Sequence, residues 1–144
     1  MNKSIKILVV DDDAVARGVL IHYLSSYGSC TEAENGAKAV EQIRQAIIDK
    51  APFEVVCLDI MMPKMDGLDT LQAIRQIEKE NQIEPANQAK VIMTTTASQV
   101  SKTMKAFHYG CNAYLVKPVS KDDLYREMMK LPVSERYKAY WRTL

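Results

Sequence analysis

The stretch that decides the fold reads Ile5-Lys6-Ile7-Leu8-Val9-Val10-Asp11-Asp12-Asp13. Its first six residues are mostly β-branched or apolar, and three aspartates end the run abruptly. A continuous apolar run of this length is typical of a strand buried on both faces, as strands of a parallel sheet are. Apolar residues at helical spacing follow, and Asp13 is suited to cap the helix that they predict.

The same alternation of a strand and a helix recurs four more times along the chain. Further strands are predicted at residues 29–34, 53–58, 90–94 and 112–116. Further helices are predicted after Asn35-Gly36, from Gly67, around residues 100–107 and after Ser120, while Gly28 is expected to end the first helix and residues 78–89 to form an exposed connection. This alternation predicts an α/β fold, a doubly wound five-stranded parallel sheet with helices on both faces.

Length and composition exclude several classes of protein. The 144 residues fit one domain, and 19 basic against 18 acidic side chains give no argument for nucleic acid or an anionic membrane as a partner. The three cysteines, Cys30, Cys57 and Cys111, form neither a CxxC zinc motif nor a disulfide framework. The apolar run at the start is too short for a signal sequence or a membrane span, so we expect a cytoplasmic protein.

The ends of the predicted strands carry the reactive side chains. Strand one ends at Asp11 and Asp12, strand three at Asp59, strand four at residues 94–96 and strand five at Lys117. The carboxyl ends of parallel strands meet at one edge of a sheet, so these groups are expected to converge. Converging carboxylates share protons or bind a cation, and oxygen ligands without His or Cys favour Mg²⁺. With an ammonium and a threonine hydroxyl, the set is suited to phosphoryl transfer onto an aspartate.

Three segments resemble the receiver domain of two-component response regulators. They are residues 9–13, residues 113–118 and residues 58–67, which carry the motif D-x-x-M-P-x-M-D-G. The resemblance covers about residues 4–131 and implies a single-domain protein similar to the chemotaxis receivers. It also implies the flavodoxin-like strand order 2-1-3-4-5. We therefore expect a receiver domain over residues 1–131 and a short basic and aromatic tail over residues 132–144, with no output domain.

The resemblance implies that Asp59 accepts a phosphoryl group. The donor would be a phosphohistidine on a sensor histidine kinase or on a histidine phosphotransfer protein, and Mg²⁺ would be the cofactor. Asp12 would bind the metal directly and Asp11 mostly through water. The acceptor Asp59 and the backbone carbonyl of Met61 would complete the metal site.

The remaining implied roles fall on strands four and five. Thr95 and Lys117 would bind phosphoryl oxygens, Tyr114 would be an aromatic switch, and Pro118 would follow a cis peptide bond. Thr95 is preferred over its neighbour Thr94 because it stands 22 residues before Lys117, which is the usual spacing in this family.

Three positions near the site depart from the family pattern. The residue after the threonine is usually very small, whereas here it is Thr96, whose bulk narrows access to an acyl phosphate. The positions two beyond Asp59 and two beyond Thr95 are Met61 and Ala97, and neither side chain can hydrogen-bond an attacking water. We therefore predict slow self-dephosphorylation, with no other enzyme activity.

Output is expected to leave through the surface of the domain. Helix four, strand five and helix five carry His108, Tyr114, Tyr125 and Met129 near the expected switch surface. The protein would bind an unknown target there as a diffusible regulator, or would relay its phosphate to another histidine. Phosphorylation would act as a population shift between two conformations.

Two other functions compete with this interpretation. Residues 11–15 also match the D-x-D-x-[TV] pattern of haloacid-dehalogenase-like phosphatases, in which Asp11 would be the nucleophile and Asp13 the general acid. That alternative leaves Asp59 and residues 63–67 without a role. A phosphate-independent interaction module is the second alternative. The aromatic tail is expected to form a short helix that docks on the domain, or else a contact with a partner.

Overall fold

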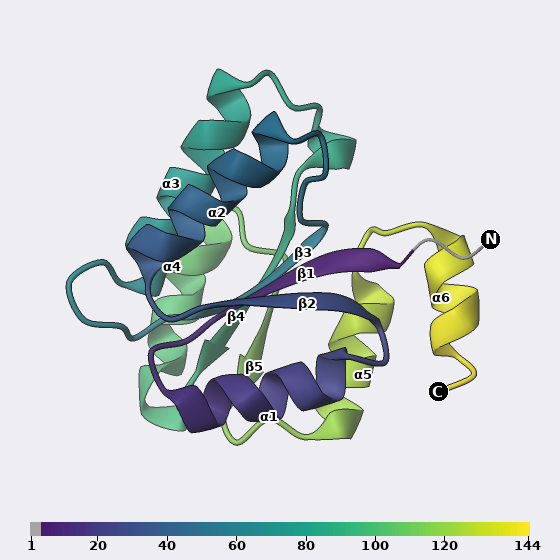
Figure 1. Ribbon diagram of the computed structural model, residues 1–144. Coiled ribbons are helices and arrows are strands. Elements are labelled where there is room, and N and C mark those ends of the chain that lie inside the picture. Colours follow the sequence, from purple (N-terminus) through teal and green to yellow (C-terminus); the bar gives the residue numbers. More distant parts are fainter. Residues whose placement is uncertain (1–3) are drawn as a thin grey trace.

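The computed structural model describes residues 4–144 (Figure 1), so the first three residues of the expected domain 1–131 lie outside the described part. The helices labelled η are short 3-10 helices. Along the chain the elements are β1 (Ile5–Val10), α1 (Ala14–Leu24), β2 (Gly28–Ala33), α2 (Gly36–Ile48), β3 (Val55–Asp59), α3 (Gly67–Glu80), η1 (Pro85–Asn87), β4 (Lys90–Thr95), η2 (Ala97–Lys102), α4 (Thr103–His108), β5 (Ala113–Val116), α5 (Lys121–Lys130) and α6 (Glu135–Trp141).

The five strands form one parallel sheet in the order β2-β1-β3-β4-β5, which confirms the predicted fold class and strand order. Strand β1 pairs with β2 on one side and with β3 on the other. The direction of winding therefore reverses between β1 and β3, and the carboxyl ends of these strands lie side by side, since Val10 pairs with Leu58, the residue before Asp59. In such sheets the crevice beyond this reversal is where ligands bind.

Two layers of helices cover the sheet, and each packs on its own apolar cluster. Helices α2, α3 and α4 cover one face, and α1, α5 and α6 cover the other (Figure 1). Strand β1 supplies both clusters because its side chains alternate, with Leu8 on the first face and Ile7 and Val9 on the second. This double burial is why its sequence is continuously apolar.

The prediction that Gly28 ends the first helix was wrong. Helix α1 ends at Leu24, and Gly28 is the first residue of β2, paired with Ile5. A Cβ at Gly28 would lie 2.3 Å from the carbonyl oxygen of Ile5, which is closer than any side chain can approach. The glycine is therefore required by the close approach of two strands and not by the end of a helix.

The prediction of an exposed connection over residues 78–89 was also wrong at both of its ends. Helix α3 continues to Glu80, and the side chain of Glu78 is buried because it pairs with Arg75 at 2.7 Å. The second carboxylate oxygen of Glu78 accepts a hydrogen bond from the backbone N–H of Ala89, which is also buried. Only the middle of the segment, around η1, lies exposed.

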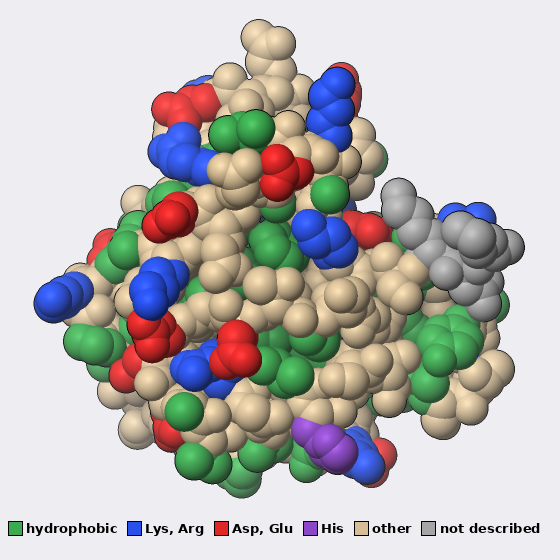
Figure 2. All heavy atoms as spheres, viewed as in Figure 1, with side chains coloured by type: hydrophobic (Ala, Val, Ile, Leu, Met, Phe, Trp, Pro, Cys, Tyr) green, Lys and Arg blue, Asp and Glu red, His purple; other side chains and the backbone are tan. Residues whose placement is uncertain are grey.

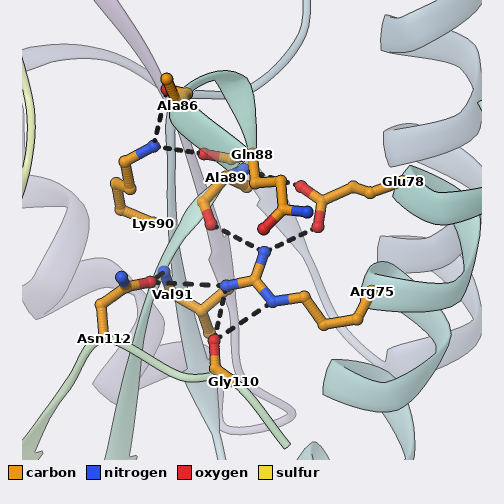
Figure 3. Close-up of polar contacts among 9 residues, drawn as sticks. All are labelled: Arg75, Glu78, Ala86, Gln88, Ala89, Lys90, Val91, Gly110 and Asn112. Atoms are coloured by element: carbon orange, nitrogen blue, oxygen red, sulfur yellow. Dashed lines mark hydrogen bonds and ion pairs between the residues drawn. The ribbon is translucent and has the colours of Figure 1, made fainter. Parts of the chain in front are cut away.

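Arg75 joins three segments at the amino edge of the sheet (Figure 3). Its guanidinium donates to the carbonyl oxygens of Ala89 and Gly110 as well as to Glu78. Asn112 accepts from Arg75 and from the backbone N–H of Val91. The network, here called the Arg75 network, therefore ties α3 to the start of β4 and to the end of α4.

The fourth helical segment is less regular than predicted, because only its second half is an α-helix. It begins as the 3-10 helix η2 and becomes the α-helix α4 only at Thr103, and neither part has a side-chain N-cap. Phe107, which lies in α4, is 45% exposed and meets Tyr114 edge to face with 6.3 Å between ring centroids. The helix therefore keeps one aromatic side chain on the surface.

The C-terminal residues form α6, and its aromatic side docks on the domain as the pattern of the tail predicts. Trp141 is fully buried in the cluster that covers the second face. Its indole N–H donates to the backbone oxygen of Tyr27 at 3.3 Å, and the two rings meet edge to face. Helix α6 thus adds to the core beside α1.

Charged side chains of both signs are interspersed on the face drawn in Figure 2, and no large patch of one sign is seen there. Within residues 4–144, no helix is long and apolar enough to cross a membrane.

Candidate functional site

The carboxyl edge of the sheet brings together four of the predicted side chains. Ligand oxygens of Asp11, Asp12 and Asp59 all lie within 4.8 Å of one another. Lys117 donates to Asp11 at 2.9 Å, and its ammonium lies 3.4 Å from Asp59. Asp11 and Asp59 are buried, whereas Asp12 is exposed to solvent. The site therefore opens to solvent on the side of Asp12.

The three aspartates of the loop after β1 differ in the contacts that their carboxylates make. Asp13 is the N-cap of α1, and its carboxylate accepts from the backbone N–H groups of Val15 and Ala16. Asp11 accepts from the backbone N–H of Asp13, which turns its other oxygen toward Lys117. The carboxylate of Asp13 is engaged in helix capping, which argues against the general-acid role that the phosphatase alternative gives it.

Arg17 was missed by the sequence analysis, although it supports this loop. Its guanidinium donates to the backbone oxygen of Asp11 at 2.6 Å and pairs with Glu32 at 2.7 Å. The cation therefore fixes the end of β1 against β2. Its place in the first turns of the helix that follows three aspartates is the signal that would have indicated it.

The loop after β3 holds Asp59 close to α3. The backbone N–H of Met61 donates to Asp59 at 3.3 Å, and the Met61 side chain is 45% exposed. Helix α3 begins at Gly67, where a Cβ would lie 2.2 Å from the carbonyl oxygen of Asp59. Asp66 caps the same helix in a capping box with Asp69. Glycine at position 67 is thus what allows the helix to start against the acceptor backbone.

Burial and like charge shape the titration of the site. Burial, followed by the charge of Asp11, raises the pKa of Asp59 from 3.8 to about 6, although Lys117 opposes the shift. Burial alone would lower the pKa of Lys117, but its hydrogen bond to Asp11 and the charge of Asp59 outweigh burial, and the pKa is raised. Lys117 therefore stays protonated, and its single positive charge is smaller than the summed negative charge of the carboxylates around it.

Within residues 4–144, the hydroxyls of the threonines at the end of β4 form no hydrogen bond to the side chains of this cluster. Thr95 is buried, and its hydroxyl donates to the backbone oxygen of Thr96 at 3.2 Å. Thr94, the alternative, pairs with Asp59 in the sheet register, and its buried hydroxyl has no hydrogen-bond partner within residues 4–144. Neither hydroxyl donates to Asp59 or interacts with Lys117 in the described part of the chain.

The two predicted switch residues lie on and just after β5. Tyr114 is 36% exposed and faces Phe107 on the outer surface rather than the acidic cluster. The peptide bond between Lys117 and Pro118 is cis, and the backbone N–H of Lys117 donates to the oxygen of Thr95.

A comparison with known families supplies the assignment. The model of the response regulator receiver domain matches residues 7–129. The chain belongs to this family. It is 36% identical over 119 residues to the chemotaxis protein CheY of Bacillus subtilis, which covers 81% of this chain and 88% of that protein. It is 30% identical to CheY-3 of Vibrio cholerae, covering 91% of this chain and 94% of that protein.

Solved structures of receivers have the same fold as this chain. The CheX–CheY–BeF3–Mg²⁺ complex from Borrelia burgdorferi matches with a TM-score of 0.75 and 25% identity over 92% of each chain. CheY4 of Vibrio cholerae matches with a TM-score of 0.71 and 26% identity, covering 88% of this chain and 98% of that one.

Family membership makes the chain a signalling receiver rather than a conventional enzyme, which disfavours both alternative functions. As a receiver domain of two-component signal transduction, it receives a phosphoryl group from a histidine donor. The acidic cluster fits the cation that such a reaction needs, because three carboxylates offer only hard oxygen ligands.

Proposed function

We propose that Asp59 is the phosphoacceptor of this receiver. The observation that carries the proposal is the position of its buried carboxylate, 3.4 Å from the Lys117 ammonium and grouped with two further carboxylates. The donor is a phosphohistidine on a sensor histidine kinase or a histidine phosphotransfer protein. Asp11, Asp12, Asp59 and the backbone carbonyl of Met61 would hold Mg²⁺, which would supply positive charge to neutralise the transferred group.

The transfer breaks one bond and forms one. A carboxylate oxygen of Asp59 attacks phosphorus while the bond between phosphorus and the donor imidazole nitrogen breaks, and the electron pair stays on that nitrogen. Lys117 binds a phosphoryl oxygen as the group arrives. The nucleophile is the ionised form of Asp59, whose pKa of about 6 leaves it largely charged at neutral pH.

A hydroxyl at the end of β4 binds a second phosphoryl oxygen. We assign this role to Thr95, which gives up its bond to Thr96 and donates to the phosphoryl group. Thr94 is the alternative, and the single variants Thr95→Val and Thr94→Val separate the two. The variant that lacks the phosphoryl-binding hydroxyl should still be phosphorylated but should lose the conformational response. Tyr114 turns inward when the threonine moves, which changes the surface formed by α4, β5 and α5.

That surface is the proposed docking site for the target. Phe107, Tyr114 and Val116 are each more than one third exposed there, and Arg126 and Lys130 on α5 border the same groove. A switch that moves Tyr114 alters the aromatic pair with Phe107 and therefore the shape of the groove. Through this surface the protein either binds a target protein or passes its phosphoryl group to a second histidine.

The phosphorylated form should be long-lived. Hydrolysis requires water to attack phosphorus and return the free carboxylate and inorganic phosphate. Neither Met61 nor Ala97 carries a group that can orient this water. Introducing an amide with Met61→Asn should shorten the lifetime of the acyl phosphate several-fold, measured as loss of radiolabel. An unchanged lifetime would show that this position does not control hydrolysis.

Labelling decides between this proposal and its alternatives. The protein is treated with radiolabelled acetyl phosphate and Mg²⁺, and the modified residue is mapped in the wild type and in Asp59→Asn. Label on Asp59 that is lost in the variant supports the receiver site. Label on Asp11 with repeated turnover would instead indicate a phosphatase, and absence of label from the wild type would refute the proposal.

A further inference from the structure

Lys102 lies beside the acceptor loop on the segment that leads from β4 into α4. It is the last residue of η2 and is half-buried, and its ammonium donates to the sulfur of Met61 at 3.2 Å. A thioether is a weak acceptor that cannot neutralise a cation. Among the ion pairs of residues 4–144, none includes Lys102.

One residue links this cation to the acceptor. The side chain of Met61 contacts Lys102, while the backbone N–H of Met61 donates to the carboxylate of Asp59. The exposed side chain of Met61 therefore holds an ammonium next to the loop that receives the phosphoryl group.

The phosphorylated site has an excess of negative charge that this ammonium can neutralise. A divalent cation together with Lys117 matches the three clustered carboxylates. Phosphorylation replaces the single charge of Asp59 with about 1.5 to 2 negative charges. The loaded site then carries up to about one negative charge that neither Mg²⁺ nor Lys117 compensates. Lys102 is the cation that the structure places beside it.

We propose that Lys102 is a further phosphoryl-binding residue, which leaves Met61 when Asp59 is loaded and pairs with the phosphoryl oxygens. The inference rests on the proposed function of Asp59. The exchange replaces a neutral sulfur with charged oxygens, which form shorter and stronger hydrogen bonds. Because Lys102 directly precedes α4, the new contact also draws the start of that helix toward the β3–α3 loop.

The test measures binding of a phosphoryl mimic and of the metal separately. Beryllofluoride is titrated calorimetrically into the full chain at saturating Mg²⁺, and Mg²⁺ alone is titrated in parallel. Lys102→Gln should weaken beryllofluoride binding about five- to tenfold, with a smaller loss at high salt. Its affinity for Mg²⁺ alone should be unchanged or slightly higher, because a positive charge has been removed.

Two further variants show whether the effect belongs to Lys102. The matched control is Lys105→Gln, which removes an exposed charge from the next turn and should stay within twofold of the wild type for both ligands. Lys102→Arg, which keeps the cation, should retain most of the beryllofluoride affinity.

The outcomes separate the two proposals. If the wild type and Lys102→Gln bind beryllofluoride equally, or if Lys105→Gln loses as much as Lys102→Gln, Lys102 has no specific role, and the site at Asp59 stands. A wild type that takes no beryllofluoride, or takes it equally well as Asp59→Asn, overturns the proposed function together with the inference.

Discussion

Buried charges occur at both edges of the sheet, and the two groups differ in how far opposite charges and hydrogen bonds compensate them. At the amino edge, Arg75 pairs with Glu78 and donates its other hydrogen bonds to backbone carbonyls and to Asn112 (Figure 3). Both carboxylate oxygens of Glu78 accept hydrogen bonds. At the carboxyl edge, three carboxylates share one ammonium, Lys117. Charge is balanced in the first group and unbalanced in the second.

The difference separates a group that holds the fold from a group that binds a ligand. Charges that are balanced and fully hydrogen-bonded gain no stability from an additional ion. The Arg75 network therefore holds elements of the fold together and does not bind a ligand. At the other edge, burial and then the charge of Asp11 raise the pKa of Asp59 to about 6, so binding of a cation or a proton is favoured there.

The largest expected effect comes from breaking the balanced group. Arg75→Met should lower the free energy of unfolding by about 3 kcal/mol, because it leaves Glu78 as a buried and unpaired carboxylate. Urea unfolding measures the loss. The rate of phosphorylation by acetyl phosphate, measured in the folded protein, should not change. The double variant Arg75→Met with Glu78→Met should recover part of the stability, and a double variant as unstable as the single one would contradict this interpretation.

At the carboxyl edge, in contrast, removal of a charged side chain should stabilise the protein. Because the folded-state pKa of Asp59 lies near 6 instead of 3.8, its ionisation at pH 7 costs folding about 2 to 3 kcal/mol. Asp59→Asn, which cannot ionise, should therefore be more stable than the wild type by that amount in buffer free of Mg²⁺.

The pH dependence gives the sign of this effect. A raised acid pKa contributes stability that is fully present below pH 3.8 and is lost as pH rises through about 6. The difference between Asp59→Asn and the wild type should therefore be small near pH 4 and reach its full size above pH 6. A difference that does not vary over this range would show that the stability of the variant has another cause.

A smaller effect is expected when the single cation of the unbalanced edge is removed. Lys117→Gln leaves three carboxylates without a neutralising ammonium, so affinity for Mg²⁺ should rise about three- to tenfold. Affinity for beryllofluoride at saturating Mg²⁺ should fall, because Lys117 also binds the phosphoryl group. Calorimetry of both ligands checks this opposition, and a parallel change in the two affinities would contradict it.

The smallest effect is expected at the rim of the balanced group. Asn112→Ala removes the acceptor of the hydrogen bond from the Val91 N–H and of a long hydrogen bond from Arg75. Asn112 is itself exposed. The free energy of unfolding should fall by about 1 kcal/mol, measured in urea against the wild type. A loss as large as that of Arg75→Met would mean that the network depends on Asn112 more than its contacts indicate.

The sequence was sufficient for the elements whose signals are local. Apolar runs that end in aspartates located β1 and β3, and Asp13, Asn35 and Ser120 cap the helices that were expected to follow them. The cluster of Asp11, Asp12 and Asp59 with Lys117 was predictable for a geometric reason, since parallel strands carry their last residues to one edge.

Contacts between distant segments were not predictable in the same way. A polar residue in a sequence does not reveal its partner, so Glu78 resembled an exposed residue until Arg75 and Ala89 were placed around it. Gly28 resembled a helix stop because its contact with Ile5 depends on strand pairing. Lys102 gave no signal, since its relation to Met61 exists only in the folded chain.

The contact between Gly67 and the main chain of Asp59 has a mechanical consequence. The peptide that carries the acceptor abuts the start of α3 with no room for even a methyl group. On its other side stand β4 and the irregular turn η2, which is not held by a side-chain cap. The peptide of the acceptor is therefore sterically confined on the side of α3, and we expect any rearrangement that follows phosphorylation to occur on the side of β4 and η2.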